Sequence, residues 1–144
     1  MKTLLALLVS TLLVVGAAPA GAAAPDTELE DTTWALRTIV KVSSGGAHAD
    51  AWRARGQELR IADGKVSFDT GCNRGFGPVE VLDDTLEFGA LATTRIGCLG
   101  RTARIERLIL KVLVAGAAWR IAGERLRISV TIGRFDHRLN YRAT

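Results

Sequence analysis

Cys72 and Cys98 are the residues of this chain whose chemistry is easiest to specify, because they are its only two cysteines. They could form a disulfide, bind a metal, act as a redox dithiol or remain buried free thiols. A metal site has little support, since there is no Cys-x-x-Cys and His48 and His137 are the only imidazoles. A redox pair also usually occurs as Cys-x-x-Cys. An even number of cysteines in an exported protein favours a disulfide, which we predict here, with the other three states left open.

Polar residues accompany both cysteines. Asn73 and Arg74 follow the first one, and Thr94 and Arg95 precede the second. If the disulfide forms, these side chains can hydrogen-bond to nearby backbone and make a rigid structural corner. The alternative is a binding site, in which the two arginines hold a carboxylate or phosphate with paired hydrogen bonds. We favour the structural corner and keep the ligand site as the second hypothesis.

No arrangement of residues in the chain indicates catalysis. There is no Gly-x-Ser-x-Gly elbow, His-Glu-x-x-His zinc helix, P-loop or Gly-x-Gly-x-x-Gly fingerprint. We therefore expect no enzyme activity, no catalytic residues and no cofactor. His137 shares strand parity with apolar residues and is expected to pack inside the fold or near a strand edge. A metal site formed by Asp136, His137, His48 and Asp50 is the weaker alternative, because their spacing is not diagnostic.

The remaining candidate contacts are an aromatic residue and the basic surface. Trp52 lies in an expected loop, where it either packs over one end of the fold or forms an exposed anchor for a partner. The formal net charge is +4, and a basic surface can attract acidic partners. No basic run interleaved with aromatics indicates nucleic acid, so we expect a protein or small-molecule partner instead.

The first residues are typical of an export signal. Lys2 precedes the uncharged run 4–15, and Ala18-Pro19-Ala20 fits the small-x-small cleavage pattern. We expect a signal peptide over residues 1–20, with cleavage alternatives up to residue 24, followed by a tether over residues 21–31. The signal contains no cysteine for lipid attachment, and no later apolar run could span a membrane. The product is expected to be secreted or periplasmic, soluble and monomeric.

The elements that would position these residues are mostly short strands. Apolar residues alternate on both sides of Asp63-Gly64, a pair that favours a tight hairpin turn. A second hairpin is expected around Asp83-Asp84, a first strand near residues 34–40, and three strands after residue 118. Between Ser43 and Gly56 we expect a loop, and the segment 69–78 is polar and rich in glycines that permit turns.

One segment has the helical period instead. Apolar residues recur between residues 101 and 114 at positions 105, 108, 109, 112 and 113, which form one stripe on a helix. Gly116 is placed to end this helix. We interpret the helix as one that closes the core of a small β-domain.

The overall composition suits one globular domain, with 48% hydrophobic and 24% charged residues. About eight short strands and one helix inserted before the last strands predict a mainly β fold. We expect a small antiparallel β-barrel or a strongly curved sheet, because closure would also protect the strand edges.

Gly71-Cys72-Asn73-Arg74, followed by the segment 93–98 (Thr-Thr-Arg-Ile-Gly-Cys), resembles the META domain, the family of the bacterial heat-shock protein HslJ. The similarity extends over residues 32–144, from Trp34-Ala35-Leu36 to Gly123 and Leu126. It implies a small barrel-like fold, an exported or envelope location and no established catalytic residues. Many family members are lipoproteins, whereas this chain lacks the lipid-bearing cysteine.

These observations lead to two functional hypotheses. The first is an exported, non-enzymatic META-domain protein that acts through surface contacts, with a role in stress as the resemblance implies. The second is a lipocalin-like carrier that holds a small apolar or anionic ligand inside the barrel. An apolar cavity open at one end would favour the carrier, and a filled core would favour the interaction module.

Overall fold

The computed structural model describes residues 28–144. The predicted signal peptide, its cleavage sites and the first part of the predicted tether lie outside the described residues. Within residues 28–144 no helix combines the length and the apolar character that crossing a membrane requires.

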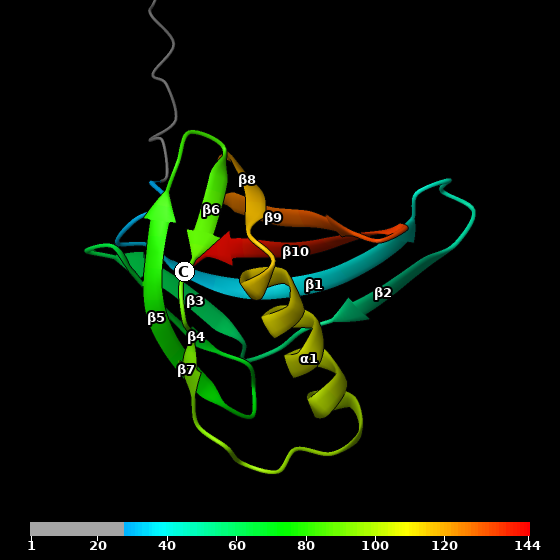
Figure 1. Cartoon of the computed structure of the whole chain (residues 1–144), viewed down its shortest axis with the longest axis horizontal. Helices are drawn as coiled ribbons and strands as arrows, with labels where there is room; N and C mark the ends of the chain where they lie inside the picture. Colours follow the sequence, from blue (N-terminus) through cyan, green and yellow to red (C-terminus); the bar gives the residue numbers. More distant parts are fainter. Residues whose placement is uncertain (1–27) are drawn as a thin grey trace, which may run out of the picture.

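Eight antiparallel strands form a closed ring, which confirms the predicted β-barrel (Figure 1). Hydrogen bonds between the first and last strands close it, with Ile39 opposite Leu139. In ring order the strands are β1 (Thr33–Ser43), β3 (Glu58–Ala62), β4 (Lys65–Asp69), β5 (Arg74–Val81), β6 (Thr85–Phe88), β8 (Ala117–Ala122), β9 (Arg125–Ile132) and β10 (Phe135–Ala143).

Two further strands lie outside this ring, and sequence analysis predicts neither. β2 (Ala49–Arg53) pairs with β1 inside the segment expected to be a loop, and β7 (Ala92–Thr93) pairs with β5. The β2 sequence has no β-branched residue and little alternation, so its own residues do not indicate a strand. β2 is extended because its backbone is hydrogen-bonded to the long strand β1.

The Asp63-Gly64 turn joins β3 to β4 as predicted. Both residues have positive φ angles, 51° and 66°, as a tight hairpin turn of type I′ requires. The second predicted hairpin is present as well, because β5 pairs with β6 around Asp83-Asp84.

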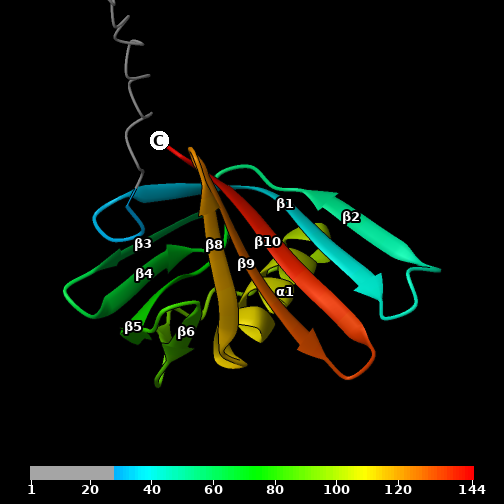
Figure 2. The same cartoon turned by 90° about the horizontal axis from the view of Figure 1, so that it is seen from above.

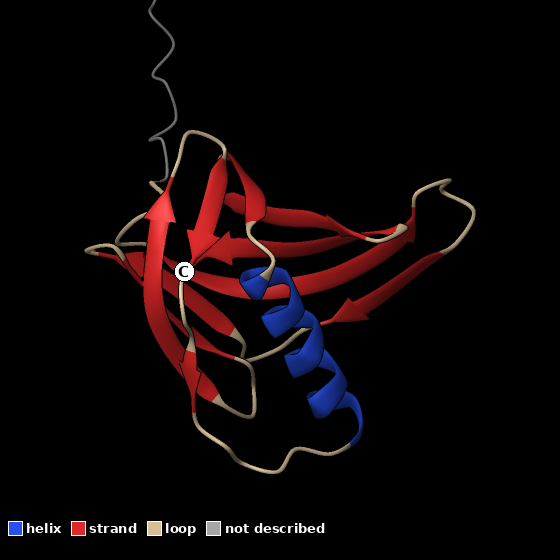
Figure 3. Ribbon diagram, viewed as in Figure 1, coloured by secondary structure: helices blue, strands red, loops and turns tan. Residues whose placement is uncertain are grey.

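Helix α1 (Gly100–Val114) covers one side of the barrel (Figures 1 and 3). Four residues of the predicted stripe are buried, and Leu108 is half-buried. Gly116 follows the helix with a φ of +68°. The helix contacts β9 and β10, so its apolar side chains complete the core from the inner face of these strands. The buried stripe residues are Ile105, Ile109, Val112 and Leu113.

Residues 28–31, which the sequence places in the tether, are attached to the barrel. The side chain of Leu29 is 6% exposed, and its carbonyl accepts a hydrogen bond from the Trp34 indole at 3.0 Å. Glu30 forms a bridge to Ile61 of β3. A single leucine among acidic residues has no periodicity, which explains why the sequence gives no indication of this contact.

Two glycines of β5 are needed for close packing and not for the turns that the sequence suggests. A Cβ on Gly75 would lie 2.2 Å from Cζ of Phe68, and one on Gly77 would lie 2.7 Å from the Ala90 carbonyl oxygen. Of the three glycines in the segment 69–78, Gly71 alone has the positive φ of a turn, at +81°. The Phe68 ring therefore occupies the space that a side chain at position 75 would fill.

Candidate functional site

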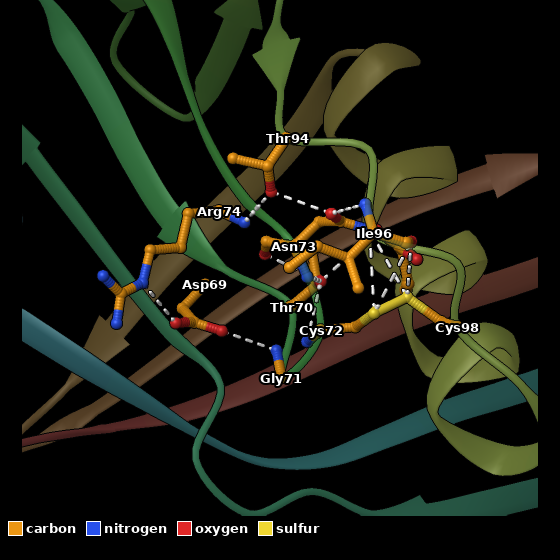
Figure 4. Close-up of a disulfide and its surroundings, with 10 residues drawn as sticks. Asp69, Thr70, Gly71, Cys72, Asn73, Arg74, Thr94, Ile96 and Cys98 are labelled. Carbon is orange, nitrogen blue, oxygen red and sulfur yellow. Dashed lines mark hydrogen bonds and ion pairs between the residues drawn. A yellow bond between two sulfur atoms is a disulfide. The ribbon is translucent and has the colours of Figure 1, made fainter.

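The predicted disulfide between Cys72 and Cys98 is present and joins the segment before β5 to the loop before α1 (Figure 4). Their Cα atoms are 6.3 Å apart. Glu106 of α1 lies beside the two sulfur atoms, and the three residues form a possible metal-binding group by position. Sulfurs joined in a disulfide are not thiolates, however, so this group does not fit a metal site.

Asn73 lies at the centre of this region, where it is 4% exposed. Its Oδ1 accepts hydrogen bonds from the Ile96 amide at 2.7 Å and from the Thr94 hydroxyl at 2.8 Å (Figure 4). Its Nδ2 donates to the Ile96 carbonyl at 3.1 Å and to Oε1 of Glu106 at 2.7 Å. Each polar atom of this buried amide is therefore satisfied within the protein.

Thr70 and Glu106 complete these contacts, although sequence analysis selects neither. The Thr70 hydroxyl contacts the backbone of Asn73. It accepts a hydrogen bond from the backbone N–H at 2.8 Å and donates one to the backbone carbonyl at 2.9 Å. Glu106 is the only acidic residue of α1, in a helix that otherwise carries basic residues. Its isolated negative charge is the one feature of the sequence that could have identified Glu106 as part of this region. We call the disulfide together with Thr70, Asn73, Thr94, Ile96 and Glu106 the corner.

The two candidate arginines lie apart from the amide of Asn73. The Arg74 guanidinium is exposed and donates to Oδ2 of Asp69 at 3.1 Å, while its backbone amide donates to the Thr94 hydroxyl. Arg95 is exposed. The contacts thus favour the structural corner over a joint anion site, because Asn73 has no free polar atom to offer a ligand.

The loop between β7 and α1 exposes apolar side chains. Within this segment, residues 94–99, which we call the corner loop, Ile96 is 64% exposed and Leu99 is 88% exposed. Asn73 holds both backbone polar groups of Ile96, and the disulfide fixes position 98. The corner loop therefore presents two apolar side chains on a firmly attached backbone.

Trp52 is half-buried and packs against the core. It also lines a surface hollow of about 590 Å³ with Arg53, Arg101 and Arg104. The indole thus both packs against the barrel and borders solvent, and its use as a partner anchor stays a prediction.

His137 faces the interior, where it is 1% exposed. Burial lowers the pKa of its imidazole, and the positive charges of Lys111 and Lys41 lower it further, while the Phe135 backbone and Asp136 act in the opposite direction. Neither ring nitrogen has a partner with hydrogen-bond geometry among the described residues. This position fits a packed neutral histidine.

The structure does not bring the four-residue metal alternative together. His48 and Asp50 form an exposed pair at 3.7 Å, and Asp136 accepts a hydrogen bond from the Thr131 hydroxyl at 2.7 Å. His137 is buried on the inner face of the sheet, opposite to its neighbour Asp136, and among residues 28–144 these four side chains form no group close enough to hold a metal ion. These side chains belong to separate environments.

Comparisons with known proteins agree with this barrel. Residues 27–140 match the family model of the META domain. An NMR structure of a protein from Burkholderia xenovorans has a TM-score of 0.59 and 24% identity, covering 90% of this chain and 99% of that one. A second NMR structure has a TM-score of 0.59 and 18% identity, covering 79% of this chain and 90% of that one. At these identities both likenesses concern the fold alone, and no curated protein matches. The family match extends across nearly all of the described residues, and the chain therefore belongs to the META domain family.

Proposed function

We propose that this META-domain protein is an exported, non-enzymatic module that acts through its surface in the cell envelope or outside the cell. The resemblance to the family of HslJ supports a role in stress tolerance. The disulfide is consistent with an oxidising compartment, since such bonds persist mainly outside the cytoplasm.

The filled interior of the barrel carries this proposal. Trp34, Leu86 and Leu139 are fully buried in one continuous core, and α1 adds Val112 and Leu113 to it. A lipocalin-like carrier needs interior space for its ligand. The barrel architecture by itself is compatible with such a carrier, but side chains occupy the apolar centre. Surface contact is therefore the function that the geometry supports best.

The corner loop is the contact that we expect a protein partner to use. Ile96 and Leu99 expose apolar area, and exposed apolar groups on a fixed backbone bind at a small cost in conformational entropy. The corner supplies that fixed backbone through four hydrogen bonds of Asn73 and the disulfide.

Native mass spectrometry of the protein purified from its own culture medium or envelope tests the first part of the proposal. We expect a processed, bare monomer that is lighter by about 2 Da than the reduced chain, as one disulfide requires. A stoichiometric small molecule released on denaturation would instead support the carrier. Retention of residues 1–20 in the exported protein would contradict the predicted signal peptide.

Site-specific photo-crosslinking in the native host tests the corner loop. A photoreactive residue at position 99 should give a discrete cross-linked species, and the same residue at position 114 should not. Val114 is the matched control because it is also an exposed apolar residue, at 68%, but lies at the other end of α1. Equal cross-linking from both positions would mean that the corner loop has no specific partner.

A further inference from the structure

Five arginines converge on one surface hollow on the outside of the barrel. The hollow has a volume of about 450 Å³ and lies over the strands β8, β9, β10 and β1. Figure 2 shows β8, β9 and β10 side by side, with α1 behind them. Along β9 the exposed arginines alternate with Leu126 and Ile128, which are buried in the core beside α1, so the hollow is on the face turned away from the helix. The arginines, which define what we call the arginine hollow, are Arg37, Arg120, Arg125, Arg127 and Arg142.

The strand register places these like charges directly opposite one another. Arg120 of β8 pairs with Arg127 of β9, and Arg125 of β9 pairs with Arg142 of β10. Like charges at directly opposed positions destabilise a sheet. Two such pairs next to each other are unfavourable for folding, and an anion bound between them would remove the repulsion.

A fourth strand adds Arg37 through an irregularity. The pairing of β1 with β10 shifts between Leu36 and Thr38, so Arg37 has no partner residue on β10. A bulge of this kind changes the direction of a side chain relative to a regular strand. Arg37 lines the same hollow as the other four arginines.

The negative charge near the arginine hollow is small. Arg142 donates to Oε2 of Glu124 at 2.8 Å, and Arg127 donates to Oδ1 of Asn140 at 3.2 Å. Within residues 28–144, no carboxylate is within ion-pair distance of the guanidinium groups of Arg37, Arg120 or Arg125. Three guanidinium groups are thus available to a ligand.

The extent of the charge indicates a compact ligand. On the same face of β10, going from Arg142 toward the start of the strand, Arg138 is the last basic residue and Asp136 comes next. The positive charge therefore ends within a few residues of the hollow. A long polyanion or a membrane would be better matched by a basic surface that continued. The volume lies in the range of small-molecule sites, about 300–1,000 Å³. Leu126 and Tyr141 border the hollow only through the strand backbone, because their side chains are buried in the core on the other face.

We propose that the arginine hollow binds a small molecule that carries a diphosphate group. Guanidinium groups bind phosphate oxygens with paired hydrogen bonds, and two adjoining phosphates can use three of them at once. This site goes beyond the proposed contact at the corner loop and involves other strands, so either proposal can fail without the other.

Isothermal titration calorimetry of the mature chain with sodium pyrophosphate tests the site, with sodium sulfate at equal ionic strength for comparison. We expect pyrophosphate to bind more tightly than sulfate. R120Q and R125Q should each weaken binding by about tenfold, the usual effect of removing a charge-assisted hydrogen bond. R138Q is the matched control, since it removes the same charge from the same face but outside the hollow. It should change the affinity by about twofold or less, because Arg138 does not line the hollow and salt weakens its longer-range attraction to a ligand there.

Thermal unfolding without ligand gives a second measurement on the same variants. R120Q should unfold at a higher temperature than the native chain, because it removes the repulsion with Arg127. Several results would overturn the proposal. These are equal weakening by R138Q and R120Q, equal affinity for sulfate and pyrophosphate, a lower unfolding temperature for R120Q, or binding to phosphatidylglycerol vesicles without binding to pyrophosphate.

Discussion

Asn73 shows at the scale of a single residue how this domain joins distant segments. Its amide connects the start of β5 to the corner loop and to α1 through four hydrogen bonds. Such a side chain is difficult to replace, because an unpaired buried polar group costs about 1–3 kcal/mol. The residue type follows from this geometry, since a side-chain amide can donate two hydrogen bonds from its nitrogen and accept two at its oxygen.

N73D should therefore lower the unfolding temperature of the protein by several degrees. The substitution keeps the shape but replaces the Nδ2 donor with an oxygen that faces Oε1 of Glu106 and the Ile96 carbonyl. Differential scanning calorimetry measures the effect. R74A is the control, and its unfolding temperature should change little because an exposed ion pair contributes about 0–1 kcal/mol. Unchanged stability of N73D together with lost partner binding would move Asn73 from a structural to a functional role.

At the scale of an element, β5 is shaped by what lies against it. Its sequence, Arg-Gly-Phe-Gly-Pro-Val-Glu-Val, has two glycines, which normally disfavour a strand. The structure shows why they are there. The Phe68 ring of β4 lies where a Cβ of Gly75 would be, and the segment 90–91 lies against Gly77.

G75A should destabilise the protein by about 1–3 kcal/mol, the usual cost of overpacking a core. The added methyl group would meet both the Phe68 ring and the Ala92 carbonyl oxygen, and the backbone oxygen cannot turn away. Chemical denaturation followed by tryptophan fluorescence measures the change. G45A is the matched control, because no atom lies within 4 Å of a Cβ at that position. Similar midpoints for G75A and the native chain would show that β4 and β5 are not closely packed.

At the scale of the whole molecule, the buried His137 makes the free energy of unfolding depend on pH. Its pKa in the folded protein is below 6.5, chiefly because of burial. As the pH falls below about 6.5, the unfolded chain therefore binds a proton that the folded chain does not, and stability decreases by up to about 1.4 kcal/mol per pH unit. Above that pH the residue is neutral in both states and contributes no slope.

Unfolding curves between pH 7.5 and pH 5 test this dependence. H137F should flatten the profile over this range without loss of stability at pH 7.5, since both ring nitrogens of the native residue lack partners among the described residues. H48Q removes the other histidine, which is exposed, and should keep the native profile. An unchanged slope in H137F would show that His137 is not the group that titrates.

Much of the fold follows from local patterns that can be recognised in the sequence. Alternating apolar residues predict the strand pairs around Asp63-Gly64 and Asp83-Asp84, and the stripe ending at Leu113 predicts the helix. β2 is the clearest exception, because its conformation depends on β1 and not on its own residues. Local sequence is informative where an element's own side chains determine its conformation.

The sequence by itself determined the class of fold, the two hairpin turns and the helix, because periodicity and turn propensity act over a few residues. It favoured the disulfide for a different reason, since the chain has only two cysteines. Only the tertiary structure decided which elements meet. Three features join residues that are far apart in the chain. They are the pairing of β1 with β10, the hydrogen bond between Asn73 and Glu106, and the arginine hollow, whose residues come from four strands. The physical reason is that alternation assigns a side chain to one face of a strand, whereas its neighbours on that face are set by strand order and register.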